Sequence, residues 1–303
     1  MTSITIETSK NKILPYLALV LTVIATSVGG LFIRWANAPG TVTVFYRTII
    51  SSIIMAPILK SRNISKKQPS NSIYRWIPFA ILGGLFLALD QSSWSSSLLL
   101  TKMANTTYFN SLAPLWVALF ALVFFKEKPR FIFWIGLFLA LGGTMLILGL
   151  DLSNRSGITS GDLLGLLSSF FFGGYMLVTQ FGRRHLNNLL YTWIATLSCA
   201  VFLGLMNAIL HQPIFGYPFE TYLFFLGAAI SSQVIGYYAM GYALGHIPAT
   251  IVSPTMLAKP VTTALLAFLF FGESLSQGEL LGGGLVLIGI FLINRNELKL
   301  TKE

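Results

Sequence analysis

Long apolar stretches alternate with short polar segments along almost the whole chain. Each stretch is close to the roughly 20 residues that an α-helix needs to cross a bilayer. Ten such stretches lie at residues 14–34, 41–59, 76–95, 104–125, 131–150, 162–181, 189–210, 220–240, 247–271 and 278–294. The pattern therefore predicts ten transmembrane helices, of which the third has the weakest signal because its outer end, residues 90–95, is polar.

Composition places the chain in a lipid bilayer. Of its 303 residues 54% are hydrophobic and 10% charged, and the mean hydropathy is +0.74. A single soluble core of this length cannot bury so much apolar surface. The net charge of +10 does not indicate a nucleic-acid partner, because the charged residues lie in short segments between apolar stretches and not along one soluble face.

The Lys and Arg residues predict the orientation. With both termini in the cytoplasm, 15 of the 20 lie in cytoplasmic segments, three lie outside, and Arg47 and Lys259 lie within helices. Cytoplasmic loops normally hold such an excess. We therefore expect a multi-pass protein of the cytoplasmic (inner) membrane with cytoplasmic tails at residues 1–13 and 295–303. The first apolar stretch has no evident cleavage site after it and is expected to be a retained helix.

Residues 114–147 recur, without a gap, as residues 260–293. The identical pairs are Pro114/Pro260, Ala118/Ala264, Leu119/Leu265, Ala121/Ala267, Phe124/Phe270, Phe125/Phe271, Glu127/Glu273, Gly136/Gly282, Leu139/Leu285, Gly143/Gly289, Leu146/Leu292 and Ile147/Ile293. Apolar composition alone produces Leu and Ala matches, but it does not readily place a proline, a glutamate and two glycines in the same frame. The chain therefore contains an internal duplication.

Each copy of the duplicated unit contains five predicted helices. Because five is odd, the second copy must enter the membrane from the opposite side. The expected fold is an all-α integral membrane protein of ten transmembrane helices, arranged as two inverted five-helix repeats (5+5) at residues 14–150 and 162–294 with an external linker at 151–161. The loops agree, because Lys126-Glu127-Lys128-Pro129-Arg130 is basic, whereas its counterpart, Gly272-Glu273-Ser274-Leu275-Ser276, has no basic residue.

These features resemble the drug/metabolite transporter (DMT) superfamily, in particular the EamA-type exporters and permeases. The most specific residues run from Asn110-Ser111-Leu112-Ala113-Pro114 to Lys126-Glu127-Lys128-Pro129, and each half continues into a glycine-rich helix. The resemblance implies a central cavity between inverted repeats and secondary transport of a small metabolite such as an amino acid, nucleoside or vitamin. Export is slightly favoured by the same analogy.

Away from the helix ends, the membrane interior contains three ionisable side chains, namely Arg47, Asp90 and Lys259. On insertion scales each costs at least about 2.5 kcal/mol at mid-bilayer, so such residues usually face a cavity or one another. At 1.5 Å per residue, all three lie about 20 Å from the cytoplasmic side. They are therefore the first candidates for the substrate-binding site.

The roles of these three residues have alternatives that the sequence leaves open. Asp90 and Arg47 form a purely structural ion pair, or Asp90 takes up and releases the coupling proton as its hydration changes. Lys259 precedes Pro260, which bends its helix and removes one backbone hydrogen bond. The lysine either binds an anionic or carboxylate-bearing solute at this bend or has a structural partner.

Six polar or aromatic residues complete the predicted substrate-binding set: Gln91, Trp94, Asn110, Tyr237, Tyr238 and Thr255. Each has an alternative role in helix–helix hydrogen bonding or at the membrane interface. Pro114 and Pro260 are expected to bend their helices. Asn110 lies one turn before Pro114, so it has a competing role in satisfying the backbone there.

Other function classes fit the chain less well. An enzyme within the membrane needs a cluster of nucleophile, base or metal ligands, whereas the chain has one cysteine, Cys199, and its histidines lack metal-ligand spacing. No metal or cofactor is expected. A non-transporting receptor or scaffold with a ligand cavity is the alternative to a transporter.

Overall fold

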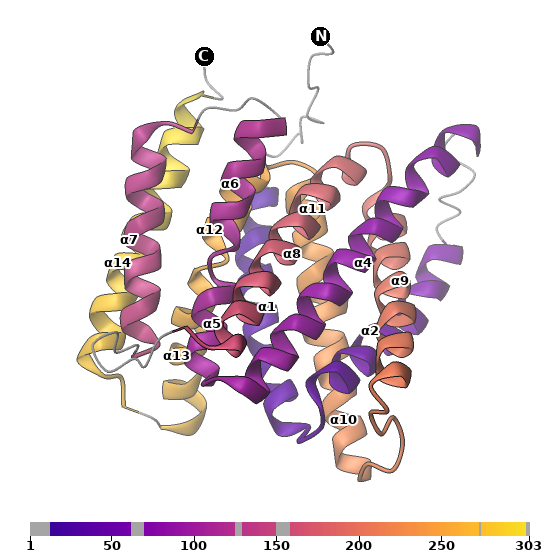
Figure 1. Cartoon of the computed structure of the whole chain (residues 1–303). Helices are drawn as coiled ribbons and strands as arrows, with labels where there is room; N and C mark the ends of the chain where they lie inside the picture. Colours follow the sequence, from indigo (N-terminus) through magenta and orange to yellow (C-terminus); the bar gives the residue numbers. More distant parts are fainter. Residues whose placement is uncertain (1–12, 62–69, 125–128, 150–157, 273, 301–303) are drawn as a thin grey trace. The chain divides into compact units, whose positions relative to one another are not determined.

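The computed structural model describes residues 13–61, 70–124, 129–149, 158–272 and 274–300. The predicted N-terminal tail lies almost wholly outside this part, as do most of the predicted linker at 151–161 and the last three residues of the predicted C-terminal tail. Every regular element within the described ranges is a helix (Figure 1). The all-α class predicted from the apolar pattern is thus confirmed.

The helices follow one another with short connections. They are α1 (Leu14–Trp35), α2 (Gly40–Ser61), α4 (Ser70–Leu100), α5 (Met103–Asn110), α6 (Ala113–Phe124), α7 (Phe131–Ile147), α8 (Ser160–Arg183), α9 (Asn188–Ile209), α10 (Phe219–Ala228), the π-helix η1 (Ala229–Tyr237), α11 (Tyr238–Leu244), α12 (Ala249–Thr255), α13 (Ala258–Phe271) and α14 (Gln277–Leu300). Within the described residues, eight helices or runs of consecutive helices are long and apolar enough to cross a membrane. The protein is therefore a multi-pass membrane protein.

The two remaining predicted helices account for the difference between eight and ten. α7 is strongly apolar but has 17 residues. α4 has 31 residues, but it contains Asp90 and a serine-rich end and does not count among the eight. The ten-helix arrangement therefore stays a prediction, with α4 as the segment that departs most from a simple apolar span.

Both repeats contain a helix break immediately before the duplicated proline. α5 ends at Asn110 and α6 begins at Ala113, so Pro114 is the second residue of α6. In the second copy α12 ends at Thr255 and Pro260 is the third residue of α13. A proline is tolerated in the first turn of a helix, where its missing N–H would have no helical partner. The bends expected at the two prolines are thus breaks in the helices.

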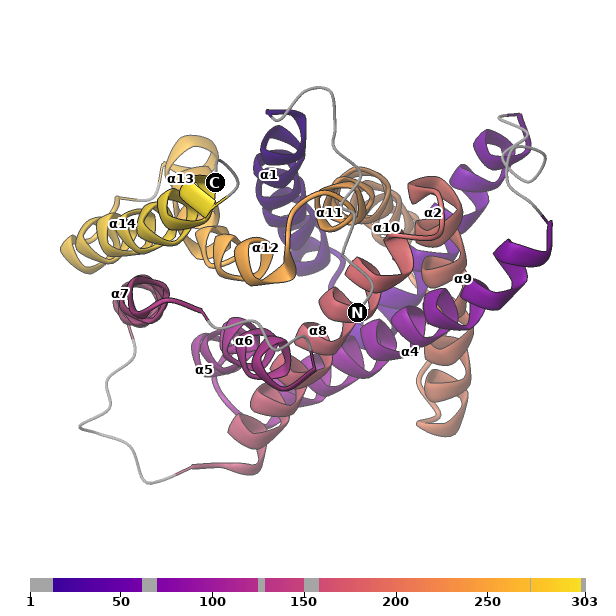
Figure 2. The same ribbon diagram turned by 90° about the horizontal axis from the view of Figure 1, so that it is seen from above.

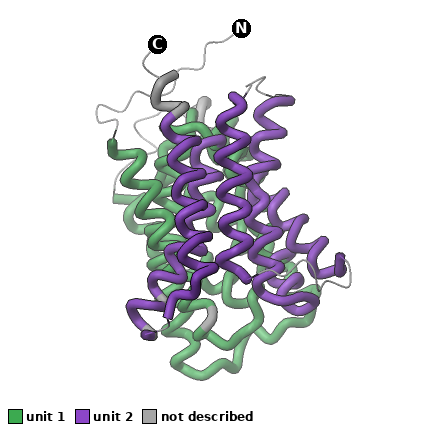
Figure 3. The backbone as a smooth tube through the Cα atoms, turned by 90° about the vertical axis from the view of Figure 1, so that its left-hand side faces the viewer, with its two compact units in different colours: residues 1–92, 175–249 green, residues 93–174, 250–303 purple. Residues whose placement is uncertain are grey.

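The chain forms two compact units that differ from the two sequence repeats (Figure 3). Unit 1 consists of Met1–Ser92 and Tyr175–Ala249, and unit 2 of Ser93–Gly174 and Thr250–Glu303. Each unit therefore takes helices from both copies of the repeat. The boundaries 14–150 and 162–294 stay a prediction about the duplication, and they do not describe how the helices pack.

In unit 2, α7 and α14 lie side by side (Figures 1 and 2). A Cβ atom at Gly136 would meet the carbonyl oxygen of Gly289, and a Cβ at Gly143 would meet that of Gly282; the reverse clashes hold at Gly289 and Gly282. This register makes the two helices antiparallel. Because the duplication maps Gly136 onto Gly282 and Gly143 onto Gly289, the contact is reciprocal, as at a two-fold interface.

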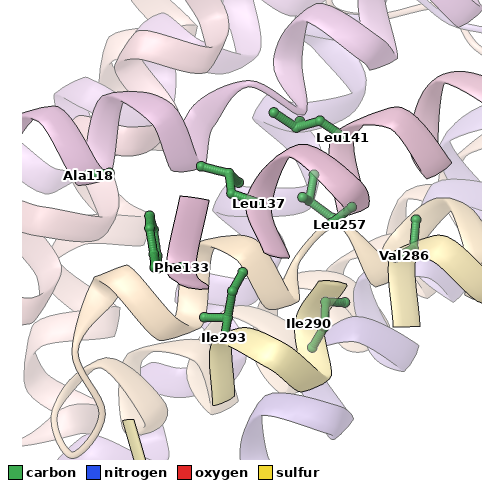
Figure 4. Packing of buried hydrophobic residues seen from close by; sticks show 9 residues of the cluster. Ala118, Phe133, Leu137, Leu141, Leu257, Val286, Ile290 and Ile293 are labelled. Carbon is green, nitrogen blue, oxygen red and sulfur yellow. The ribbon is translucent and has the colours of Figure 1, made fainter. Parts of the chain in front are cut away.

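Apolar side chains flank this glycine crossing (Figure 4). The buried cluster combines Phe133, Leu137, Ala140 and Leu141 of α7 with Val286, Ile290 and Ile293 of α14, together with Ala118 and Leu257. Within a membrane, close van der Waals packing at small residues stabilises helix pairs, since lipid supplies no hydrophobic driving force. The α7–α14 pair is therefore the packing centre of unit 2.

Unit 1 also depends on close approach at glycines. Gly29 of α1 lies against Ser232 of η1, and a Cβ at this position would overlap the serine Cβ. Gly84 of α4 lies equally close to the Ala195 carbonyl of α9. These contacts bring the backbone of α1 close to that of η1. They likewise bring the backbone of α4 close to that of α9.

Arg183 is a buried arginine at a helix end. It is the last residue of α8 and is 8% exposed. Its Nε donates a hydrogen bond to the Gly241 carbonyl (3.0 Å), and its Nη1 donates one to the Leu186 carbonyl. The guanidinium therefore satisfies the Leu186 carbonyl, which follows the end of α8, and adds a second hydrogen bond to the Gly241 carbonyl, which also accepts from the Gly245 N–H (3.2 Å).

Candidate functional site

Unit 1 brings together three predicted site residues, Arg47 of α2, Asp90 of α4 and Tyr237 at the end of η1. They are 3%, 2% and 4% exposed, respectively. The Arg47 guanidinium carbon lies 5.4 Å from the centre of the Tyr237 ring. Tyr237 interacts electrostatically with both charged residues, and so does Cys199 of α9. We call Arg47, Asp90, Tyr237 and Cys199 the polar cluster of unit 1.

Arg47 is held in place by contacts of its own helix. The hydroxyl of Ser51, one turn further along α2, donates to the Arg47 carbonyl (2.5 Å) and to the carbonyl of Ala229, the first residue of η1 (3.1 Å). On another face of α2, Trp193 of α9 donates from Nε1 to the Ser52 carbonyl (3.0 Å). α2 is therefore fixed between η1 and α9 at the level of the guanidinium.

Arg47 has unsatisfied hydrogen-bonding capacity. Its Nε and Nη2 atoms are fully buried, and neither has a hydrogen-bond partner within the described parts of the chain. Buried polar groups in native proteins are nearly always paired, so each exception requires an explanation. The sequence predicted Arg47 as a site residue, but it gave no sign that this particular edge of the guanidinium is unpaired.

The π-helix η1 supplies the side of the cluster that faces α2. π-Helical segments are rare and occur frequently at functional sites. η1 carries Gln233, whose Nε2 donates to Thr196 of α9 (2.9 Å), while its buried Oε1 has no partner among the described residues. Sequence analysis predicted Tyr237 but missed η1, since the apolar pattern looks the same for α- and π-helices.

Asp90 is joined to its predicted neighbour in the site. Gln91 donates from Nε2 to Asp90 Oδ2 at 2.8 Å. Tyr238, which follows η1, is partly buried, and its carbonyl accepts a hydrogen bond from Asn188 Nδ2 (2.9 Å). The structural ion pair of Asp90 with Arg47 and the proton-carrying role of Asp90 both stay predictions.

Unit 2 holds the other predicted residues, and three contacts meet on α8. Asn110 Nδ2 donates to Ser168 Oγ (2.8 Å), and Trp116 Nε1 donates to Ser169 Oγ (2.9 Å). Lys259 Nζ lies 5.2 Å from the centre of the Phe172 ring. Sequence analysis singled out Asn110 and Lys259 but missed Ser168 and Ser169, because serine pairs within a long apolar stretch are common.

Two predicted residues of unit 2 have less distinctive surroundings. Thr255 is the last residue of α12, and its hydroxyl donates to the Ile251 carbonyl in the same helix (2.9 Å). Trp94 is partly buried on α4. Their place in a substrate site stays a prediction, as does the role of Lys259 toward an anionic solute.

Comparison with known proteins identifies relatives over most of the chain. A Pseudomonas aeruginosa protein named pseudopaline exporter CntI is 22% identical over 264 residues, which cover 86% of this chain and 88% of that protein. An uncharacterized transporter of Bacillus subtilis, YwfM, is 26% identical over 258 residues, 82% of each chain. A solved crystal structure has a TM-score of 0.77 at 19% identity and covers 94% of this chain and 98% of its own, which shows a shared fold.

Each copy of the duplicated unit matches the model of one protein family. The model of the EamA-like transporter family matches the chain twice, over residues 13–149 and 159–295. The two matches together span nearly all of the sequence and contain every residue of the polar cluster of unit 1. The chain therefore belongs to the EamA-like transporter family, as its resemblance to EamA-type permeases of the drug/metabolite transporter superfamily implied.

Proposed function

We propose that the protein is a secondary transporter that moves a small organic metabolite across the cytoplasmic membrane by alternating access between two inverted five-helix repeats. The observation that carries the proposal is the reciprocal, antiparallel glycine crossing of α7 and α14. Equivalent helices of the two copies meet there as the halves of an inverted duplication would. Such halves exchange conformations around a central site.

The buried polar residues support a solute-binding role for the helices. Arg47 and Asp90 are costly within a membrane, and residues of this kind usually mark a substrate or ion pathway. We propose Asp90 as the group that couples transport to protons. The solute is an amino acid, a nucleoside or a vitamin-like compound. The remaining predicted residues contribute to its binding: Gln91, Trp94, Asn110, Tyr237, Tyr238, Thr255 and Lys259.

We favour export, with both termini in the cytoplasm of a prokaryote. The support for this direction is that one relative, over 86% of this chain, is named a pseudopaline exporter. The excess of Lys and Arg in the segments assigned to the cytoplasm supports the orientation.

A flux assay tests the proposal. The purified full chain is reconstituted into proteoliposomes, and a panel of amino acids, nucleosides and vitamins is followed with and without a pH gradient. We expect concentrative flux of at least one compound when the gradient is imposed. Saturable binding of a compound without any flux would contradict the proposal and favour a receptor or scaffold.

A further inference from the structure

We infer that Arg47 binds a carboxylate group of the transported solute through the Nε–Nη2 edge of its guanidinium. This inference rests on the proposed transport function and narrows the solute to a class. It assigns a chemical group of the solute to specified atoms of unit 1.

The Nε and Nη2 donors of Arg47 are unpaired within the described residues although they are fully buried. The side chain is 3% exposed. Leaving a buried donor unsatisfied costs the desolvation free energy of that group, and the cost is larger for a charged group. A ligand that supplies the acceptors offsets this desolvation cost.

The unpaired edge of the Arg47 guanidinium also matches the geometry of a carboxylate. The N–H bonds of Nε and Nη2 lie on the same edge of the planar guanidinium and point in parallel directions. A carboxylate presents two oxygens that match this edge, so the pair forms two parallel, charge-assisted hydrogen bonds. A single spherical anion such as chloride does not make this bidentate match.

The groups around Arg47 hold it in place and offer an acceptor to the solute. Its guanidinium lies 5.4 Å from the Tyr237 ring, and Ser51 fixes its helix to the start of η1. The same π-helix presents the unpaired acceptor Gln233 Oε1. The cluster therefore offers donors to an anionic group and, from the same helix, an acceptor for an N–H or O–H group of the solute.

The burial of the unpaired edge also sets a condition on access. Since Nε and Nη2 are closed to solvent in this conformation, the carboxylate reaches them in another conformation of the transport cycle. Alternating access provides such a conformation, which is why the inference depends on the proposed function.

Isosteric pairs of compounds test the inference. Thermal unfolding of the detergent-purified full chain is followed with benzoate against benzamide, nicotinate against nicotinamide, and inorganic phosphate. We expect an acid to raise the unfolding temperature more than its neutral amide does. Arg47→Lys keeps the charge but loses the planar Nε–Nη2 pair of donors, so the affinity for the acid should weaken about tenfold or more. The matched control Arg184→Lys should retain the affinity of the unaltered chain.

A second measurement does not depend on the folding of any variant. Phenylglyoxal modifies arginine side chains, and peptide mass spectrometry locates the modified sites. We expect benzoate to slow the modification of Arg47 in the unaltered chain, and benzamide to leave its rate unchanged. Equal protection by the acid and the amide, or stabilisation by phosphate alone, would overturn the inference.

The two proposals fail in different ways. Saturable flux of neutral or cationic solutes alone would overturn the carboxylate site and leave the transporter intact. If benzoate protects Arg47 but the proteoliposomes show no flux of any compound, the proposed transport is wrong, while the chemical assignment of the site holds.

Discussion

Arg47 and Arg183 are buried arginines of the same unit with opposite hydrogen-bonding states. Arg183 uses Nε and Nη1 to bind two backbone carbonyls, whereas Arg47 Nε and Nη2 have no hydrogen-bond partner among the described residues. The first arrangement stabilises the fold, while the second, on our inference, leaves donors available to a ligand. Residue type and position along the chain did not distinguish these roles.

The difference predicts a stability effect at Arg183. Replacing Arg183 with Met leaves the carbonyls of Gly241 and Leu186 without these donors in a buried place. We expect the free energy of unfolding to fall by about 1–3 kcal/mol, because the Leu186 carbonyl is left unsatisfied, whereas the Gly241 carbonyl keeps its hydrogen bond from the Gly245 N–H. Thermal unfolding of the detergent-purified chain measures the change. Arg184→Met, at the neighbouring partly exposed position, is the control, and an equal loss in both variants would contradict the assignment.

Asp90 carries a prediction about coupling. Asp90→Asn removes the carboxylate but keeps the size of the side chain, so flux driven by a pH gradient should be lost while solute exchange at equal pH continues. Asp162 is a matched control, because it is also a buried carboxylate but binds backbone and hydroxyl groups at the start of α8. If Asp90→Asn retains gradient-driven flux, the ion-pair alternative is favoured.

Sequence reasoning found the charged members of the candidate site for a simple physical reason. Ionisable groups are expensive in lipid, so Arg47 and Asp90 were conspicuous within apolar stretches. Ser168 and Ser169 were not, because a single hydroxyl is common in membrane helices. Their importance depends on which helix faces them, and that is a property of packing.

At the scale of elements, most helix positions followed from the apolar pattern. Proline chemistry predicted bends at Pro114 and Pro260, whereas the structure has breaks between α5 and α6 and between α12 and α13. The π-helix could not be predicted in this way. η1 begins and ends within one continuous apolar stretch, and its existence depends on contacts such as those of Ser232 with Gly29 and of Ala229 with Ser51. Tertiary packing therefore decided the local helix type.

The contact between α1 and η1 yields a prediction with an internal control. Gly29→Ala places a Cβ against Ser232 and should destabilise the chain by about 1–3 kcal/mol, the usual range for overpacking. Gly30→Ala should have little effect, since nothing lies within 4 Å of that Cβ position. Unfolding temperatures measure both changes.

A second substitution separates overpacking from a loss of helix flexibility. Ser232→Gly removes the side chain that the new Cβ meets, so it should restore much of the stability lost in Gly29→Ala. Absence of any rescue in the double variant would show that another contact limits this position.

At the scale of the whole molecule, the duplication was readable from the sequence, whereas the packing units were not. A repeated string of residues identifies copies of a gene segment, but it does not state which copy a helix contacts. α7 and α14 come from different copies and form the packing centre of one unit. The repeat frame also accounts for their contact, because equivalent glycines lie at the crossing in both directions.

The inverted topology predicts opposite sides for two segments of the chain. Cysteines are introduced singly at Ser3 in the predicted tail and at Ser153 in the predicted linker. In intact cells a membrane-impermeant maleimide should label Ser153→Cys, whereas Ser3→Cys should react only after permeabilisation. The unaltered chain is a low-background control because its one cysteine, Cys199, is buried. Labelling of both positions from the same side would exclude an odd number of spans per repeat.

The chain passes between the two compact units at Ser92/Ser93, Gly174/Tyr175 and Ala249/Thr250. These passages lie within α4, within α8 and at the first peptide bond of α12. A flexible loop changes conformation without moving the elements that it joins. A helix, in contrast, transmits twist and bending along its backbone hydrogen bonds. We therefore expect single substitutions at these three junctions to alter the rate of the proposed transport more than the affinity for its solute.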